Sequence, residues 1–73
     1  MSIEDAVREM YRWQFEPTNS FYNRLILCIQ MADRENRMKL AVGFPELITA
    51  FCLWHQAKDQ REFFKEWGFL KDD

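Results

Sequence analysis

Apolar side chains recur every three or four residues along most of the chain, the spacing that places them together on one face of an α-helix. Val7 and Met10 follow this spacing near the start, and Ser2 before them is a residue type that caps helix N-termini. Pro17 has no backbone N–H with which to continue a helix. The pattern therefore predicts a first helix over residues 3–15.

The second segment, residues 21–32, is apolar on two sides. Leu27 and Met31 lie one helical turn apart and point away from the larger apolar face. A helix that is apolar all round is usually central in a fold, but its second face can also contact another chain. The sequence leaves both interpretations open. The larger face, which we expect to be buried, holds Phe21, Tyr22, Leu25, Cys28, Ile29 and Ala32.

A tight corner is expected between the third and fourth helices. Asp33 can cap a third helix over residues 34–42, and Gly43 follows where a left-handed residue often ends a helix. Pro45 suits the first turn of the next helix, because the N–H that proline lacks has no partner there. The sequence therefore predicts a fourth helix over residues 45–58.

The fifth helix is expected to be separate from the fourth. On one continuous helix, its apolar residues would lie almost opposite the apolar stripe of the fourth, so a break is simpler. Asp59 can cap a fifth helix over residues 60–67, and Gly68 can end it. The stripe of the fourth helix holds Leu47, Ile48, Phe51 and Trp54, with His55 as a further candidate, and that of the fifth holds Phe63, Phe64 and Trp67.

Composition limits the class of protein. The chain has 73 residues, of which 48% are hydrophobic, so we expect one all-α domain over residues 1–73, built from about five short helices. Charges of both signs are interspersed, the formal net charge is −2, and no basic block suggests nucleic-acid or membrane binding. The longest apolar run, residues 25–29, is too short to cross a bilayer. The acidic start, with Glu4 and Asp5, is unlike a secretion signal, so a cytoplasmic protein is expected.

Cys52 and His55 are the main candidates for reactive chemistry, because residues three apart on a helix can touch. A thiolate–imidazole pair also needs an oxyanion site, and the sequence suggests no loop of that kind. Cysteine is more often a small buried residue, so we expect both side chains to be structural and the protein not to be an enzyme. One histidine and two distant cysteines make no recognised metal site, and no cofactor motif is evident.

The third and fourth helices together have the outline of a helix-turn-helix. A recognition helix should present basic or amide side chains to DNA from its first turns. Here the fourth helix begins with Pro45 and Glu46, and the basic residues Arg34, Arg37 and Lys39 lie on the preceding helix. Nucleic-acid binding is therefore not expected. A small DNA-binding regulator is kept as a third hypothesis, after the two that concern protein contacts.

Two stretches, ADRENR over residues 32–37 and GFPE over residues 43–46, resemble a pattern in small uncharacterised helical proteins of bacterial prophages and mobile elements. The resemblance covers the segment 32–46 and carries over no functional residue. It implies a short helical protein encoded by a phage or a mobile element. Such proteins often act by binding and disabling a host protein, including defence complexes.

Surplus apolar residues indicate a protein partner, because exposed apolar side chains that lie together mark an interface. The first hypothesis is therefore a non-catalytic binding protein that acts through protein–protein contact. The second is a structural homodimer without a ligand, in which the same residues form the subunit contact. The candidate protein-binding surface consists of Leu27, Met31, Leu40 and Leu53.

Overall fold

Five helices and no strand make up the part of the chain that the computed structural model describes, residues 1–16 and 19–70. The all-α fold predicted from the sequence is confirmed. Every helix begins at the predicted residue, and its end differs from the predicted one by two residues or fewer. Pro17, which was expected to stop the first helix, lies outside the described residues. The helices are α1 (Ile3–Phe15), α2 (Phe21–Met31), α3 (Arg34–Gly43), α4 (Pro45–Gln56) and α5 (Gln60–Glu66).

Side-chain caps explain why the starts of α1, α3 and α5 were predictable. The Ser2 hydroxyl accepts a hydrogen bond from the Asp5 N–H at 3.0 Å, and the Asp5 carboxylate accepts one from the Ser2 N–H at 3.1 Å. This capping box satisfies two backbone donors at the start of α1. The bond from the Ser2 N–H, followed by the Ser2 side chain and the Arg8 guanidinium, holds the pKa of Asp5 below its ordinary value. Asp33 and Asp59 likewise accept backbone hydrogen bonds at the starts of α3 and α5.

The prediction of a left-handed glycine after α3 is wrong. Gly43 is the last residue of α3 and has no positive φ, and Phe44 follows it with a φ of −135°. Phe44 serves as the cap of both α3 and α4, so the chain turns the corner within one residue. Pro45 opens α4 as predicted. Because α4 starts directly after this cap, the corner needs no left-handed residue.

A Schellman motif ends α5 instead. The Gly68 N–H donates to the Lys65 carbonyl at 3.0 Å, and the Phe69 N–H donates to the Phe64 carbonyl at 2.9 Å. Gly68 has a φ of 85°, a backbone region that a side-chain Cβ disfavours. The chain then turns back, and the ring of Phe69 lies 5.9 Å from that of Tyr11 in α1.

The two glycines should respond oppositely to alanine. We expect Gly68→Ala to lower the free energy of unfolding by about 1 kcal/mol, because a Cβ strains the left-handed backbone. We expect Gly43→Ala to raise it by about 0.5 kcal/mol, since this residue is helical and open space surrounds its Cβ position out to 4 Å. Urea denaturation followed by circular dichroism measures both changes. Destabilisation of similar size by both substitutions would show that α3 does not continue through Gly43.

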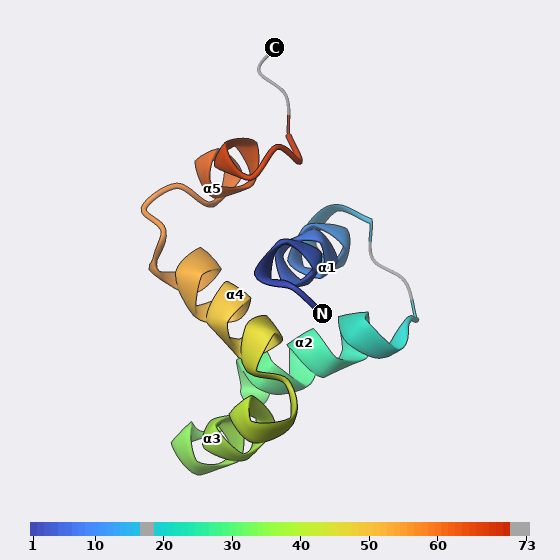
Figure 1. The fold of residues 1–73 in the computed structure, drawn as a ribbon, viewed down its shortest axis with the longest axis vertical. Coiled ribbons are helices and arrows are strands. Elements are labelled where there is room, and N and C mark those ends of the chain that lie inside the picture. The colour runs from blue at the N-terminus through green and yellow to red at the C-terminus, as the bar shows by residue number, and fades with distance from the viewer. Residues whose placement is uncertain (17–18, 71–73) are drawn as a thin grey trace.

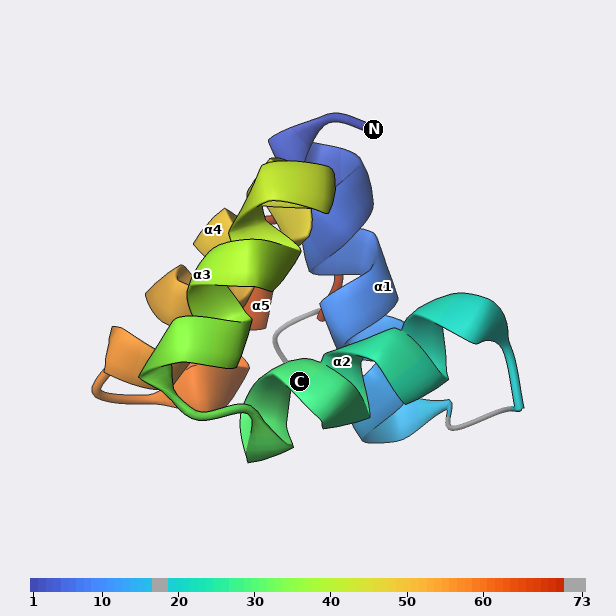
Figure 2. The same ribbon diagram turned by 90° about the horizontal axis from the view of Figure 1, so that it is seen from below.

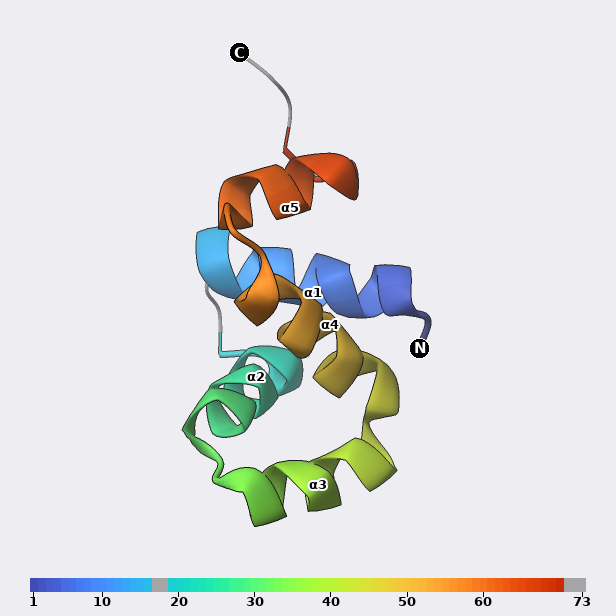
Figure 3. The ribbon, with the colours of Figure 1, turned by 90° about the vertical axis from the view of Figure 1, so that its left-hand side faces the viewer.

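α1 and α4 pack against each other in the middle of the molecule (Figure 1). α5 covers one end of the long axis, and α2 and α3 lie toward the other end, as the side view in Figure 3 shows. The molecule measures 40 × 26 × 21 Å. α3 packs chiefly against α4, and although the structure describes α3 throughout, none of its side chains is fully buried. α3 is therefore the most peripheral of the five described helices.

Aromatic rings join α5 and the end of α1 to the core. Phe64, with 1% of its surface exposed, packs edge-on against Tyr11 and Phe15, with ring centroids 5.7 Å from each. Trp13 of α1 meets Trp54 of α4 in a similar arrangement at 5.4 Å. The buried core consists of Ala6, Val7, Met10, Ile26, Ile29, Leu47, Ala50, Phe51, Trp54, Phe63 and Phe64.

The buried face of α2 differs from the predicted one. Phe21 is 63% exposed and Cys28 is also exposed, although both belong to the face expected to be buried. The helix is rotated so that Asn23 and Ile26 lie in the interior. Asn23 tolerates burial because its N–H and its side-chain amide donate to the Ser20 hydroxyl at 3.2 and 3.1 Å. The prediction fails because a polar residue occupies a buried position that the apolar pattern assigns to hydrophobic residues.

Candidate protein-binding groove between α2 and α3

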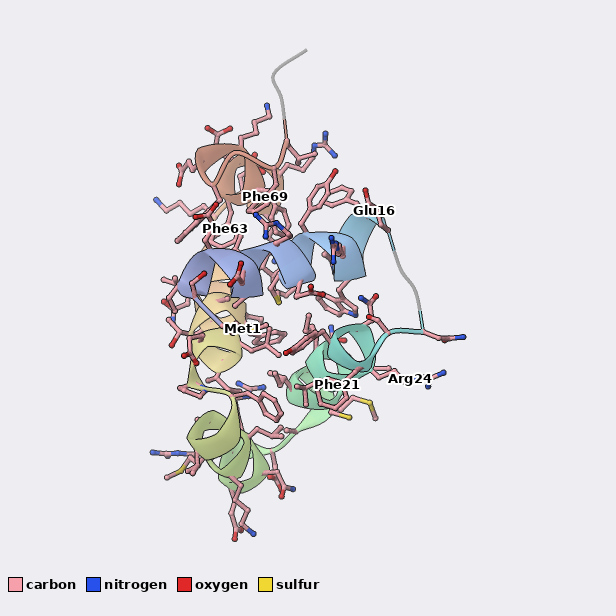
Figure 4. The ribbon with its side chains drawn as sticks, turned by 45° about the vertical axis from the view of Figure 1, so that its right-hand side comes forward. Met1, Glu16, Phe21, Arg24, Phe63 and Phe69 are labelled. Carbon is pink, nitrogen blue, oxygen red and sulfur yellow. The ribbon has the colours of Figure 1, made fainter. Side chains whose placement is uncertain are left out.

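The rotation of α2 turns a row of apolar side chains outward. Phe21, Cys28 and Met31 follow one another along the exposed side of the helix, at spacings that keep residues on one face. Met31 is 77% exposed, and Leu27, one turn before it, is 45% exposed. Arg24 shares this side, and Figure 4 shows Phe21 and Arg24 on α2, away from α1. The outer side of α2 is therefore largely apolar and carries one cation.

An open groove of about 470 Å³ lies between α2 and α3, which meet at an angle as seen from below in Figure 2. Cys28 and Met31 contribute one wall and Leu40 part of the other. At the opposite ends of the two helices, the rings of Phe21 and Phe44 lie 5.9 Å apart. The residues that line this α2–α3 groove are Cys28, Met31, Ala32, Asn36, Lys39 and Leu40.

Two of the four predicted surface residues meet in the α2–α3 groove. Met31 and Leu40 line it together, although they come from different helices. Leu27 lies one turn from Met31, and Leu40 is half-buried because it also packs against the core. Leu53 is 42% exposed on α4 and is not among the described residues that line the groove. The predicted set thus joins two residues that line the groove with two, Leu27 and Leu53, that do not.

Sequence reasoning missed several exposed apolar residues near the groove. It assigns Cys28 to the buried face of α2, yet Arg24 lies one turn earlier on the same side. A charged residue is almost never fully buried without a partner, so Arg24 was a signal that this side faces solvent. On α3, Met38 is 64% exposed and Val42, one turn later, is 86% exposed. A second open groove on α3 is lined by Ala32, Arg34, Arg37, Met38, Ala41 and Ile48.

The α2–α3 region carries excess positive charge in a chain whose net charge is −2. Both of its carboxylates are engaged, since Asp33 caps α3 and Glu35 lies 3.6 Å from the Lys39 ammonium. Among the described residues, Arg24 and Arg34 form no ion pair with a carboxylate. Residues 19–43 contain the basic residues Arg24, Arg34, Arg37 and Lys39 and the acidic residues Asp33 and Glu35.

Arg37 connects α3 with the rest of the fold. Its Nη2 donates to the Ile29 carbonyl near the end of α2 at 3.4 Å, and its guanidinium carbon lies 5.6 Å from the centre of the Phe51 ring in α4. Both contacts favour a cation, because a helix C-terminus carries partial negative charge and an aromatic face attracts positive charge. Arg37 therefore helps to hold α3 at the angle that forms the α2–α3 groove.

Cys52 and His55 occupy separate environments on α4. Cys52 is half-buried, whereas His55 is exposed and stacks on Phe51 with ring centroids 6.0 Å apart. The structure describes both side chains and shows no hydrogen bond between them. The suggestion from the sequence that His55 belongs to the buried stripe of α4 is thus wrong. The buried face of α4 contains Phe51 and Trp54 instead. That the two residues are not catalytic stays a prediction.

The described residues, 1–16 and 19–70, contain no group of three or more His, Cys, Asp or Glu side chains placed to hold a metal ion. None of the helices in the same ranges combines the length and the apolar character that crossing a membrane requires.

Compared with protein-family models, with curated proteins and with solved structures, the chain shows no match. The geometry, exposure and charge of the α2–α3 groove are therefore the features that indicate a function.

Proposed function

We propose that this protein is a non-catalytic binding protein that acts through contact between its α2–α3 groove and another protein. One observation carries the proposal: the exposed Cys28 and Met31 of α2 and the half-buried Leu40 of α3 line one open groove. A partner that covers such surface gains roughly 25 cal/mol for each Å² of apolar area removed from water. The proposal includes a phage or mobile-element origin and action in the cytoplasm, with inhibition of a host protein or defence complex as the result.

The form of the groove supports a protein partner over a small ligand. Small-molecule sites are concave and enclose most of the ligand surface. The α2–α3 groove is open, and Met31 in its lining is 77% exposed. Methionine side chains adapt to the shape of a partner because they are flexible and polarizable. A broad surface with adaptable apolar residues is typical of protein–protein contact.

Replacing Leu27 and Met31 together by alanine tests the proposal. Because both side chains are exposed, we expect the double variant to stay folded, with a free energy of unfolding changed by less than about 1 kcal/mol. A photo-crosslinker attached to Cys28 identifies the partner in a host lysate, and titration calorimetry with the purified partner then measures affinity. We expect the dissociation constant to rise at least about tenfold, the equivalent of losing about 1.4 kcal/mol of binding free energy.

Leu53→Ala is the matched control, because Leu53 is also exposed but lies outside the α2–α3 groove. Its dissociation constant should equal that of the wild-type protein. Equal affinity of the double variant and the wild type would contradict the proposal. So would a double variant that is unfolded at room temperature, since Leu27 and Met31 would then belong to the core.

The two alternative functions lead to different results. A structural homodimer would dissociate into folded monomers in the double variant, as measured by sedimentation equilibrium. A small DNA-binding regulator would bind duplex DNA with an affinity that falls steeply as salt rises. The composition of α4 disfavours the DNA alternative, because α4 would be the recognition helix and contains no arginine or lysine to contact base edges.

A further inference from the structure

We infer that the partner presents an acidic amphipathic helix to the α2–α3 groove, with apolar side chains inserted and carboxylates beside the basic residues of this chain. The inference rests on the proposed function and specifies the kind of surface that the groove recognises. Two features carry it: the apolar row along α2 and the excess positive charge around that row.

The apolar row on α2 has the dimensions of a helix-binding site. Phe21 and Met31 stand at opposite ends of α2, so the row is about 15 Å long at a rise of 1.5 Å per residue. About three turns of a partner helix cover this length, and its anchors at i, i+3 or i+4 and i+7 match the spacing of such a row. The described elements are all helices, so they offer no strand edge that an extended peptide could join.

Carboxylates on the partner would find available cations along this row. Lys39 lines the groove, and its pair with Glu35 at 3.6 Å joins side chains that are 72% and 80% exposed. An ion pair that is this exposed contributes little to stability. Lys39 can therefore leave Glu35 and pair with a carboxylate of the partner. Arg24 lies on the outer side of α2 and donates to the Asn19 side-chain oxygen at 3.0 Å rather than to a carboxylate. Acidic residues beside the apolar anchors of a partner helix therefore complement both cations.

A second copy of this chain matches the groove less well. In a two-fold dimer the same surface of each subunit faces its equivalent, so the cations of one α2–α3 region would approach those of the other. Within the region, Asp33 already caps α3 and Glu35 already pairs with Lys39. Like charges that face one another across an interface select against that pairing. The charge pattern thus favours a different partner that is acidic.

Selection from a displayed peptide library tests the inference. The probes are amphipathic helices of about four turns, with leucine fixed at anchor positions and glutamate or lysine chosen at random elsewhere. We expect peptides selected on the wild-type protein to carry mainly glutamate, and those selected on the Arg24→Glu, Lys39→Glu variant to carry mainly lysine. Bound acidic peptide should slow alkylation of the exposed Cys28 at least about tenfold, by excluding the reagent from the groove. The half-buried Cys52 is the internal control.

The outcomes separate this inference from the proposed function. Suppose that the selected peptides show no excess of glutamate and that their binding is lost in Met31→Glu. This result would overturn the inference of an acidic partner helix but would leave the proposal of a protein-binding groove. Peptides that bind wild type and Met31→Glu equally, with Cys28 unprotected, would overturn both. The wild-type chain could instead self-associate or bind phosphatidylserine vesicles. If either interaction were lost in Met31→Glu, the inference of an acidic partner helix would also be overturned. Circular dichroism of each variant confirms that it is folded, as the exposure of Met31 leads us to expect.

Discussion

Phe64→Ala should lower the free energy of unfolding by about 3–5 kcal/mol, the usual cost of removing a buried phenylalanine ring. Phe64 is 1% exposed and contacts Tyr11 and Phe15 from α1, so its loss opens a cavity between α5 and α1. A domain of 73 residues is stable by only about 4–11 kcal/mol at typical values per residue. The variant should therefore lose a large fraction of its stability. Urea denaturation followed by circular dichroism and by tryptophan fluorescence measures the change.

Phe21→Ala is the control for this prediction, because it removes the same ring from a side chain that is 63% exposed. Its effect should stay below about 1 kcal/mol, as for most surface substitutions. If Phe64→Ala cost no more than Phe21→Ala, α5 would not be part of the cooperative core. The pair thus tests whether the short α5 is stabilised by its packing on α1 rather than by its own helix propensity.

Arg37→Ala should lower the free energy of unfolding by about 1–2 kcal/mol, the second largest effect expected on stability. The substitution removes the hydrogen bond to the Ile29 carbonyl and the contact with the Phe51 ring. α3 has no fully buried side chain in the described structure, so these contacts supplement the packing of the half-buried Leu40 against the core. Amide hydrogen exchange should show loss of protection in α3 before the rest of the fold. The α2–α3 groove should lose its shape in the same variant.

Arg34→Ala is the matched control, since Arg34 is exposed on the same helix. Its effect should stay within about 0.5 kcal/mol of zero. Arg37→Lys should recover only part of the loss, because an ammonium cannot reproduce the planar fork of a guanidinium. Equal effects of Arg34→Ala and Arg37→Ala on α3 protection would show that Arg37 does not hold this helix in place.

Local chemistry was sufficient to determine the helix starts. Ser2, Asp33 and Asp59 each accept hydrogen bonds from N–H groups two or three residues ahead, and these interactions depend on adjacent residues alone. The break between α4 and α5 follows from the opposed directions of their apolar stripes, which is also a property of the sequence. The all-α fold was predictable for the same reasons.

The apolar pattern alone did not predict which face of α2 is buried or how α3 ends. Asn23 tolerates the interior because the Ser20 hydroxyl accepts hydrogen bonds from its N–H and its side-chain amide, and the same orientation of α2 exposes Phe21. Gly43 remains helical because Phe44 serves at once as the last cap of α3 and the first of α4. In both cases a neighbouring residue stabilises a conformation that the residue type alone does not predict. Ser20 does so for the buried Asn23, and Phe44 does so for the helical Gly43.

The α2–α3 groove depends partly on the sequence pattern and partly on the tertiary structure. The sequence by itself placed Leu27 and Met31 outside the larger apolar face that it predicted for their helix, and the structure leaves both exposed. That Met31 meets Leu40 was decided by the tertiary structure, because it depends on the angle between two helices. Contacts such as that of Arg37 with the Ile29 carbonyl hold this angle. They join different helices through single side chains, so they leave no periodic signal in the sequence.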